Sequence, residues 1–369
     1  MTVKKLQSRP GQFRRLLGLS VDEFTQLACA VRPLYEVQEE RRLTQRPRVR
    51  AVGGGRPFTL SVEERLLATL LYYRLHLTGF LLGCLFEIHE SNLWRERNER
   101  MLPILLEVLP IPMQDHLLSA LENGDSGSGG SGSGGSGSGG SGSSGGKRSG
   151  KRIGTLKELL EAYPELRDLC IDATEQEVPQ YQNKREKKQF YSGKSHCHTV
   201  KTQVTTAGRL VVHMMGNCPG SMADRQLLKA SGVLRSISAA ATPVKRKAQQ
   251  GKRPVLSTAR HRRRVRLDRG YSGLEKEGKP EKNQYGSLPG VKVLAALKGS
   301  GRSKLTVLGK AWNYTMVSPQ RMQVEQNIGH LKNWRALSGL YRADWQRHQS
   351  TVAVVAGLHN FGILGSLNW

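Results

Sequence analysis

Acidic residues are scarce in this chain, with 30 Asp and Glu against 57 Lys and Arg. The resulting formal net charge of +27 is spread over all 369 residues, so it is not confined to a detachable basic tail. Such an excess favours a polyanionic partner, because bound phosphates are neutralised and their counterions are released. A membrane surface is the competing polyanion, but no apolar run approaches the ~20 residues that a spanning helix needs. We therefore expect nucleic acid, and no membrane, as the partner.

Cysteine is also scarce, and no Cys-x-x-Cys pair occurs among Cys29, Cys84, Cys170, Cys197 and Cys218. The odd number and irregular spacing predict reduced, structural thiols. A zinc site made of His196, Cys197, His198 and Cys218 is the alternative, but adjacent residues on a strand point to opposite faces. The first residues lack the apolar core of a signal peptide, which predicts a cytoplasmic, nucleoid-associated protein.

Side-chain variety disappears between Ser126 and Gly146, where every residue is Gly or Ser. A chain of this composition is a flexible coil with a root-mean-square span of about 25 Å. The tract divides the sequence into a helical region (1–122), a flexible linker (123–150) and a C-terminal domain (151–369). A natural low-complexity segment and an engineered joint both fit this composition.

The N-terminal region has the apolar spacing of helices. Ser61 and Glu64 form a capping-box signature at the start of one helix. Two further helices are predicted at 80–88 and at about 92–106. A long helix, a short helix and a basic third helix form the order of a helix-turn-helix unit, here at about 58–109, with Arg95 and Arg97 as DNA contacts. The alternative is a three-helix bundle whose arginines are only solvated.

The C-terminal domain alternates between strand-like and helical patterns after a helix capped by Thr155 and Glu158. The elements predicted next are strands at 169–172, 198–206 and 210–215, a helix at 221–231, a strand at 265–268 and a helix at 320–334. This order predicts an α/β fold with an RNase H-like core, in which a mixed sheet is flanked by helices. A basic insertion at about 232–264 is either a mobile, solvated segment or an arm that neutralises phosphates.

Three isolated carboxylates stand out in this basic background. Asp172 and Asp268 each end a predicted strand, and Glu325 lies within the helix at 320–334. In such a core the first and fourth strands are neighbours, so the three acids would meet, and they would repel each other without a cation. Oxygen ligands suit Mg²⁺ or Mn²⁺, and two such ions promote phosphodiester cleavage. The alternative for each acid is a turn or helix cap, and the competing ligands are Glu175, Glu177 and Asp224.

Five motifs, in this order, resemble the DDE transposase domain of bacterial insertion sequences and the PIF/Harbinger superfamily. They are Ile171-Asp172-Ala173-Thr174-Glu175, Tyr191-Ser192-Gly193-Lys194 with His198-Thr199-Val200-Lys201-Thr202-Gln203, Pro219-Gly220-Ser221-Met222-Ala223-Asp224, Leu267-Asp268-Arg269-Gly270-Tyr271, and Val324-Glu325-Gln326-Asn327-Ile328-Gly329-His330-Leu331-Lys332. The stretch 58–109 also resembles the helix-turn-helix that precedes this domain in such transposases. Two positions depart from the pattern, because Ala223 stands where relatives often carry His and Ser318 where many carry Tyr.

The resemblance implies that the catalytic residues and metal ligands are Asp172, Asp268 and Glu325, with Asp224 in a supporting role. The basic residues that it assigns to DNA contact are Arg321, Lys332, Lys194 and Lys201. Lys332 follows Glu325 by seven residues, close to two helical turns, so both can face the same groove.

The activity that the resemblance implies is cut-and-paste DNA transposition. The enzyme would bind the terminal inverted repeats of an element, cleave its ends with the help of Mg²⁺ or Mn²⁺, and join the freed 3′ hydroxyl to target DNA. Because two ends are cut together, a homodimer is expected. Two alternatives remain, namely a non-catalytic DNA-binding protein derived from a transposase and a different RNase H-like nuclease.

Overall fold

The computed structural model describes residues 2–44, 60–114, 153–241, 263–268, 271, 288, 290–296 and 306–367. The predicted linker at 123–150 and most of the predicted basic insertion lie outside these residues. Within the predicted insertion, residues 233–241 form the helix α12. No helix in the described part of the chain is long and apolar enough to cross a membrane.

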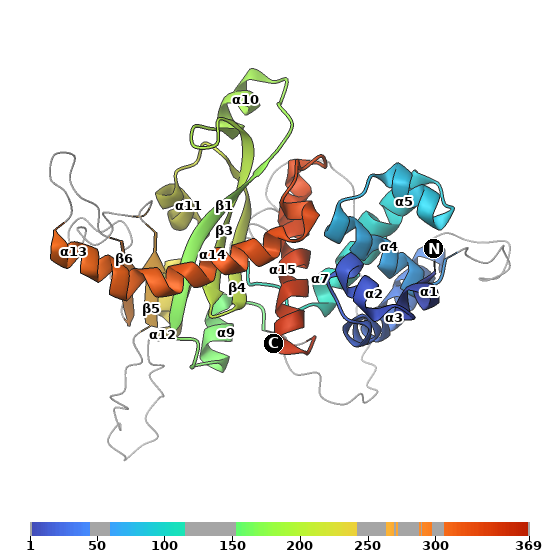
Figure 1. The fold of residues 1–369 in the computed structure, drawn as a ribbon, viewed down its shortest axis with the longest axis horizontal. Coiled ribbons are helices and arrows are strands. Elements are labelled where there is room, and N and C mark those ends of the chain that lie inside the picture. Colours follow the sequence, from blue (N-terminus) through green and yellow to red (C-terminus); the bar gives the residue numbers. More distant parts are fainter. Residues whose placement is uncertain are drawn as a thin grey trace, which may run out of the picture.

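The N-terminal region is entirely helical (Figure 1). Its elements are α1 (Val3–Gln7), α2 (Pro10–Leu17), α3 (Val21–Thr44), α4 (Val62–Leu75), α5 (Gly79–Phe86), α6 (Glu90–Arg95), the π-helical segment η1 (Glu96–Met101) and α7 (Leu102–Val108). The predicted capping box is confirmed at α4, where Ser61 Oγ accepts a hydrogen bond from the Glu64 amide at 3.2 Å and the Glu64 carboxylate accepts one from the Ser61 amide at 3.0 Å. Thr78 caps α5 in a similar way through the amide of Leu81.

A mixed sheet forms the centre of the C-terminal part. Its strands are β1 (Asp168–Glu177), β2 (Tyr191–Ser192), β3 (Cys197–Ala207), β4 (Leu210–Pro219), β5 (Arg263–Leu267) and β6 (Val291–Ala295). The order is β2-β3-β1-β5-β6, and β4 pairs with β3. β1 pairs antiparallel with β3 and parallel with β5, and β5 pairs parallel with β6. This antiparallel meander followed by parallel strands confirms the predicted RNase H-like core.

Helices cover both faces of the sheet. They are α9 (Leu156–Ala162), α10 (Lys184–Phe190), α11 (Asp224–Ser231), α12 (Val233–Ala241), α13 (Val307–Trp312), α14 (Ser318–Lys332) and α15 (His348–Leu364), with shorter turns η3 (Asn313–Val317), η4 (Arg335–Leu337) and η5 (Trp345–Arg347). Val211 packs in the core with α15, and Val212 packs in the core with α9 and α12, as adjacent strand residues that point to opposite faces must. Figure 1 shows α14 crossing the sheet and α15 between the sheet and the N-terminal helices.

The two parts of the chain share one hydrophobic core. Buried residues of α3 and α4, such as Leu27 and Leu70, belong to the same cluster as Val354 of α15 and Trp334. The side chain of Asn360 on α15 also donates to the carbonyl oxygen of Pro110, which follows α7. The helical region therefore packs directly onto the C-terminal sheet and its helices, although the Gly/Ser tract separates the two parts in sequence.

Candidate active site

Asp172 and Asp268 occupy equivalent positions on neighbouring parallel strands. The register of β1 and β5 places Ile171 opposite Leu267, and each aspartate is the next residue along its own strand. Paired strands lie about 4.8 Å apart, so the two carboxylates are close neighbours. The residues before them, Ile171 and Leu267, are buried in the core with α9 and α12. Because side chains alternate along a strand, Asp172 points to the opposite face, which α14 covers.

Tyr271 is a buried tyrosine on which these two aspartates and a third acid act electrostatically. The sequence interpretation did not assign a role to this tyrosine. Its side chain is completely buried, and its backbone amide donates to the carbonyl oxygen of Asp268 at 3.0 Å. Burial raises the pKa of the Tyr271 hydroxyl, and the negative charges of Asp224, Asp172 and Asp268 raise it further. All three carboxylates therefore act electrostatically on one buried hydroxyl. The signal in the sequence was the tyrosine that closes Asp-Arg-Gly-Tyr.

Glu325 lies on α14, the helix that crosses the sheet. This helix packs against β1, β3 and β5, anchored by the buried side chains of Val324 and Leu331, while Glu325 itself is exposed. Among the described residues, no group of three or more His, Cys, Asp or Glu side chains is close enough together to hold a metal ion. Glu325 therefore does not form such a group with Asp172 and Asp268 in the described part of the chain, although α14 crosses the same face of the sheet.

Lys201, which the sequence predicts as a DNA contact, is held by partners inside the protein. It is buried on β3, and its ammonium group donates to the carbonyl oxygen of Met222 at 2.8 Å and to Asp224 Oδ1 at 3.0 Å. Glu175 Oε1 lies 3.3 Å from the same nitrogen. With three partners and little exposure, the ammonium group of Lys201 is engaged with groups of the protein itself.

Glu175 is held as an anion by its surroundings. Burial alone would raise its pKa, but hydrogen bonds from Ser192, Thr199 and Ser195 and the charge of Lys201 outweigh burial, and the pKa of Glu175 is lowered. Its Oε2 accepts from Thr199 Oγ1 at 2.9 Å and from Ser195 Oγ at 3.0 Å. Glu175 and Asp224, two competitors of Asp172 in the sequence interpretation, are therefore both bound to Lys201.

The other predicted basic residues lie at different distances from this site. Lys332 is exposed on α14, two turns from Glu325, and Lys194 is exposed in the turn between β2 and β3. Arg321 is also on α14, but its side chain lies outside the described residues. Arg95 is exposed on α6, whereas the guanidinium carbon of Arg97 lies 3.5 Å from the ring centroid of Tyr72.

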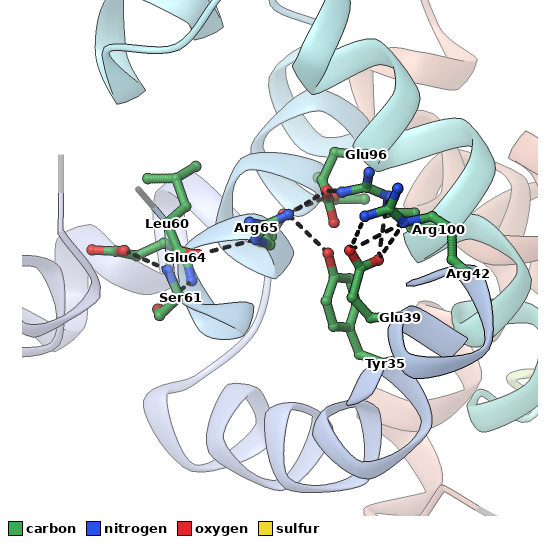
Figure 2. A network of polar contacts seen from close by, with 10 residues as sticks. Tyr35, Glu39, Arg42, Leu60, Ser61, Glu64, Arg65, Glu96 and Arg100 are labelled. Carbon is green, nitrogen blue, oxygen red and sulfur yellow. Dashed lines mark hydrogen bonds and ion pairs between the residues drawn. The ribbon is translucent and has the colours of Figure 1, made fainter. Parts of the chain in front are cut away.

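A buried ionic network fixes the helix that carries these two arginines (Figure 2). Arg65 of α4 donates to Glu96 Oε2 at 2.5 Å, to the Tyr35 hydroxyl at 2.8 Å and to the Leu60 carbonyl at 3.0 Å. Arg100 also donates to Glu96 Oε2, at 2.7 Å. Glu96 begins the π-helical segment η1, so the network joins α3, α4 and the start of this segment. Sequence patterns did not reveal this network, since its members are far apart in the chain.

Two family models match the chain. The model described as DDE superfamily endonuclease matches residues 171–360. The model described as helix-turn-helix of DDE superfamily endonuclease matches residues 58–110. The first match covers Asp172, Asp268 and Glu325, and the second covers α4, α5, α6 and α7. No curated protein and no solved structure matches the chain significantly.

Proposed function

Because the chain belongs to the DDE superfamily of endonucleases, we propose that it is a DNA transposase that cleaves the ends of a mobile element and joins them to target DNA. The observation that carries this proposal is the register of β1 and β5, which places Asp172 and Asp268 side by side on the face covered by α14. A helix-turn-helix region that packs on the same core adds a means of holding DNA next to these acids.

Asp172 and Asp268 are proposed to hold one or two Mg²⁺ or Mn²⁺ ions, with Glu325 as a further ligand from α14. When bound, such ions activate an attacking water or hydroxyl and stabilise the leaving oxygen of a phosphodiester. The donor chemistry fits, since carboxylate oxygens on paired strands suit a hard cation. Lys201 keeps Glu175 and Asp224 paired with its ammonium group, so these two acids do not compete for the cation.

The DNA contacts are assigned to exposed basic residues around the two parts. Arg95 lies on the third helix of the helix-turn-helix, and Lys194 and Lys332 lie on the catalytic-type domain. Arg321 is kept as a proposed contact because it precedes Glu325 by one helical turn. The DNA partners are the terminal inverted repeats and the target, two copies of the chain hold the two ends, and the complex acts on nucleoid DNA in the cytoplasm.

The test is cleavage of supercoiled DNA that contains the inverted repeats flanking the gene, with Mg²⁺ or Mn²⁺. Asp268→Asn and Asp172→Asn should each lower the rate by ~10³-fold, if each removes ~4 kcal/mol of transition-state stabilisation. Glu177→Gln is the matched control, because Glu177 is exposed at the far end of β1 and should leave the rate unchanged.

Strand-transfer products separate a transposase from a plain nuclease. Equal rates for wild type and Asp268→Asn would refute the catalytic assignment. DNA binding without cleavage, in the presence of either metal, would identify a DNA-binding protein derived from a transposase.

A further inference from the structure

A cleft of about 310 Å³ lies between the helix-turn-helix and the chain just before η5. Its walls come from α4, α5, α6 and η1 on one side and from Arg342 and Ala343 on the other. This volume is at the lower end of the range of ligand pockets, which runs from about 300 to 1,000 Å³. The cleft is separate from the aspartate pair, and no role proposed above uses it.

The aromatic side chains of the cleft are held by arginines and by a strained histidine. Arg97 lies over the ring of Tyr72, and Arg347 lies over the ring of Trp94 at 4.9 Å from its centroid, while Trp94 stays 44% exposed. The ring of His76 meets the Tyr72 ring edge-on at 5.4 Å. His76 ends α4 with φ of 52°, a left-handed conformation that favours Gly or Asn, so placing a histidine here costs about 1–3 kcal/mol.

The cleft also contains positive charge that is not paired with a carboxylate of the described residues. Within the described ranges, neither Arg97 nor Arg342 forms a hydrogen bond or ion pair with an acidic side chain. Burial lowers the pKa of His76, and the charges of Arg342 and Arg97 lower it further, so these cations act on the same space. Of the two acids that line the cleft, Glu96 is bound by Arg65 and Arg100, and Glu90 pairs with neither Arg97 nor Arg342.

We propose that this cleft binds one unpaired nucleotide of DNA, with the base against the exposed ring of Trp94 and the phosphate near Arg97 and Arg342. Aromatic rings beside unpaired cations are the combination with which proteins hold single-stranded nucleic acid, since rings stack on bases and cations neutralise phosphates. The cleft lies beside α6, so DNA that is held by the helix-turn-helix passes near it. The inference rests on the DNA-binding part of the proposed function, and it assigns Arg97 to an unpaired nucleotide in place of a duplex phosphate.

The test compares the affinity of the full chain for a blunt duplex and for the same duplex with a short unpaired 3′ or 5′ tail. Stacking of one base contributes about 1–3 kcal/mol, so wild type should bind one of the tailed duplexes about tenfold more tightly than the blunt one. Trp94→Ala and Arg342→Gln should each bring this ratio close to one. Arg95→Gln is the control, because Arg95 is exposed on the same helix and should weaken both duplexes alike and keep the ratio.

A second readout is the fluorescence of Trp94, which stacking of a base should quench. The tailed duplex should quench the fluorescence more than the blunt duplex does, both in wild type and in Arg95→Gln. Trp94→Phe should remove this difference. Equal affinity of wild type for tailed and blunt duplexes, or a ratio that survives in Arg342→Gln, would overturn the proposal. If the protein cleaves DNA but shows no preference for a tail, the proposed role of the cleft is refuted and the transposase assignment stands. If it prefers the tailed duplex but does not cleave DNA, the transposase assignment is refuted and the proposed role of the cleft stands.

Discussion

Replacing Glu96 with Gln should destabilise the helical region by about 3–5 kcal/mol, because the buried guanidinium group of Arg65 would then lose the carboxylate to which it donates. The side chains of Arg65 and Glu96 are only 8% and 6% exposed. Removing one partner of a buried ion pair costs about 3–5 kcal/mol. Gln can still accept a hydrogen bond, but it cannot compensate the charge of Arg65 and of Arg100, which donates to the same oxygen.

The matched control is the exposed pair of Arg32 and Glu63, whose side chains are 57% and 22% exposed. Glu63→Gln should change the free energy of unfolding by less than about 1 kcal/mol. Replacing both partners of the buried pair, as Arg65→Met with Glu96→Leu, should recover part of the loss, since the charge of Arg65 is removed with that of Glu96 while Arg100 keeps Glu39 at 3.8 Å.

Urea unfolding followed by circular dichroism and tryptophan fluorescence measures both changes. The shared core of α3, α4 and α15 predicts that the two signals change together. If Glu96→Gln costs no more than Glu63→Gln, then the network does not hold the helix as the geometry indicates. If the helical region unfolds separately from the sheet, the shared core is not cooperative.

Two further predictions concern the turn of the helix-turn-helix and the acid pair of Lys201. A Cβ added at Gly83 would lie 2.7 Å from the carbonyl oxygen of Ile88. Gly83→Ala should therefore lower the free energy of unfolding by about 1–3 kcal/mol, measured by urea titration. It should also weaken duplex binding, measured by titration with DNA. The pKa of Glu175 is lowered in the fold, so its contribution to stability is present above its ordinary value of 4.5 and is lost as pH falls through the lower folded pKa. The stability difference between wild type and Glu175→Gln should therefore shrink below about pH 4.5, and a constant difference would show that the ionised carboxylate is not what stabilises.

Much of the fold was predictable because its patterns are local. Alternating apolar residues marked β3 and β4, and the Ser61 cap marked the start of α4. The sequence interpretation missed α12, although Val233, Leu234 and Ile237 form its buried side, because the basic residues that follow dominated that stretch. It also missed β6, a short strand whose place is set by pairing with β5 and not by its own pattern.

Long-range contacts explain why the candidate site was only partly predictable. The positions of Asp172 and Asp268 followed from strand order, because adjacent parallel strands fix their neighbours. The partners of Lys201 could not be predicted from the sequence. A lysine on a strand is equally compatible with an exposed phosphate contact and with a buried ion pair. Arg97 presents the same difficulty, because its contact with Tyr72 depends on how α4 and η1 pack.

The structure also explains how several acids can share one region without serving the same purpose. An ammonium group at 3.0 Å from Asp224 and 3.3 Å from Glu175 compensates both charges, which lowers their tendency to bind a cation. Asp172 and Asp268 each follow a residue of the Ile171–Leu267 pair on β1 and β5, and Arg266 of β5 bonds to Asp168. The buried hydroxyl of Tyr271 lies within the influence of the charges of Asp224, Asp172 and Asp268. The ion pairs of Lys201 therefore distinguish Glu175 and Asp224 from Asp172 and Asp268, the two acids to which we assign the metal in the proposed function.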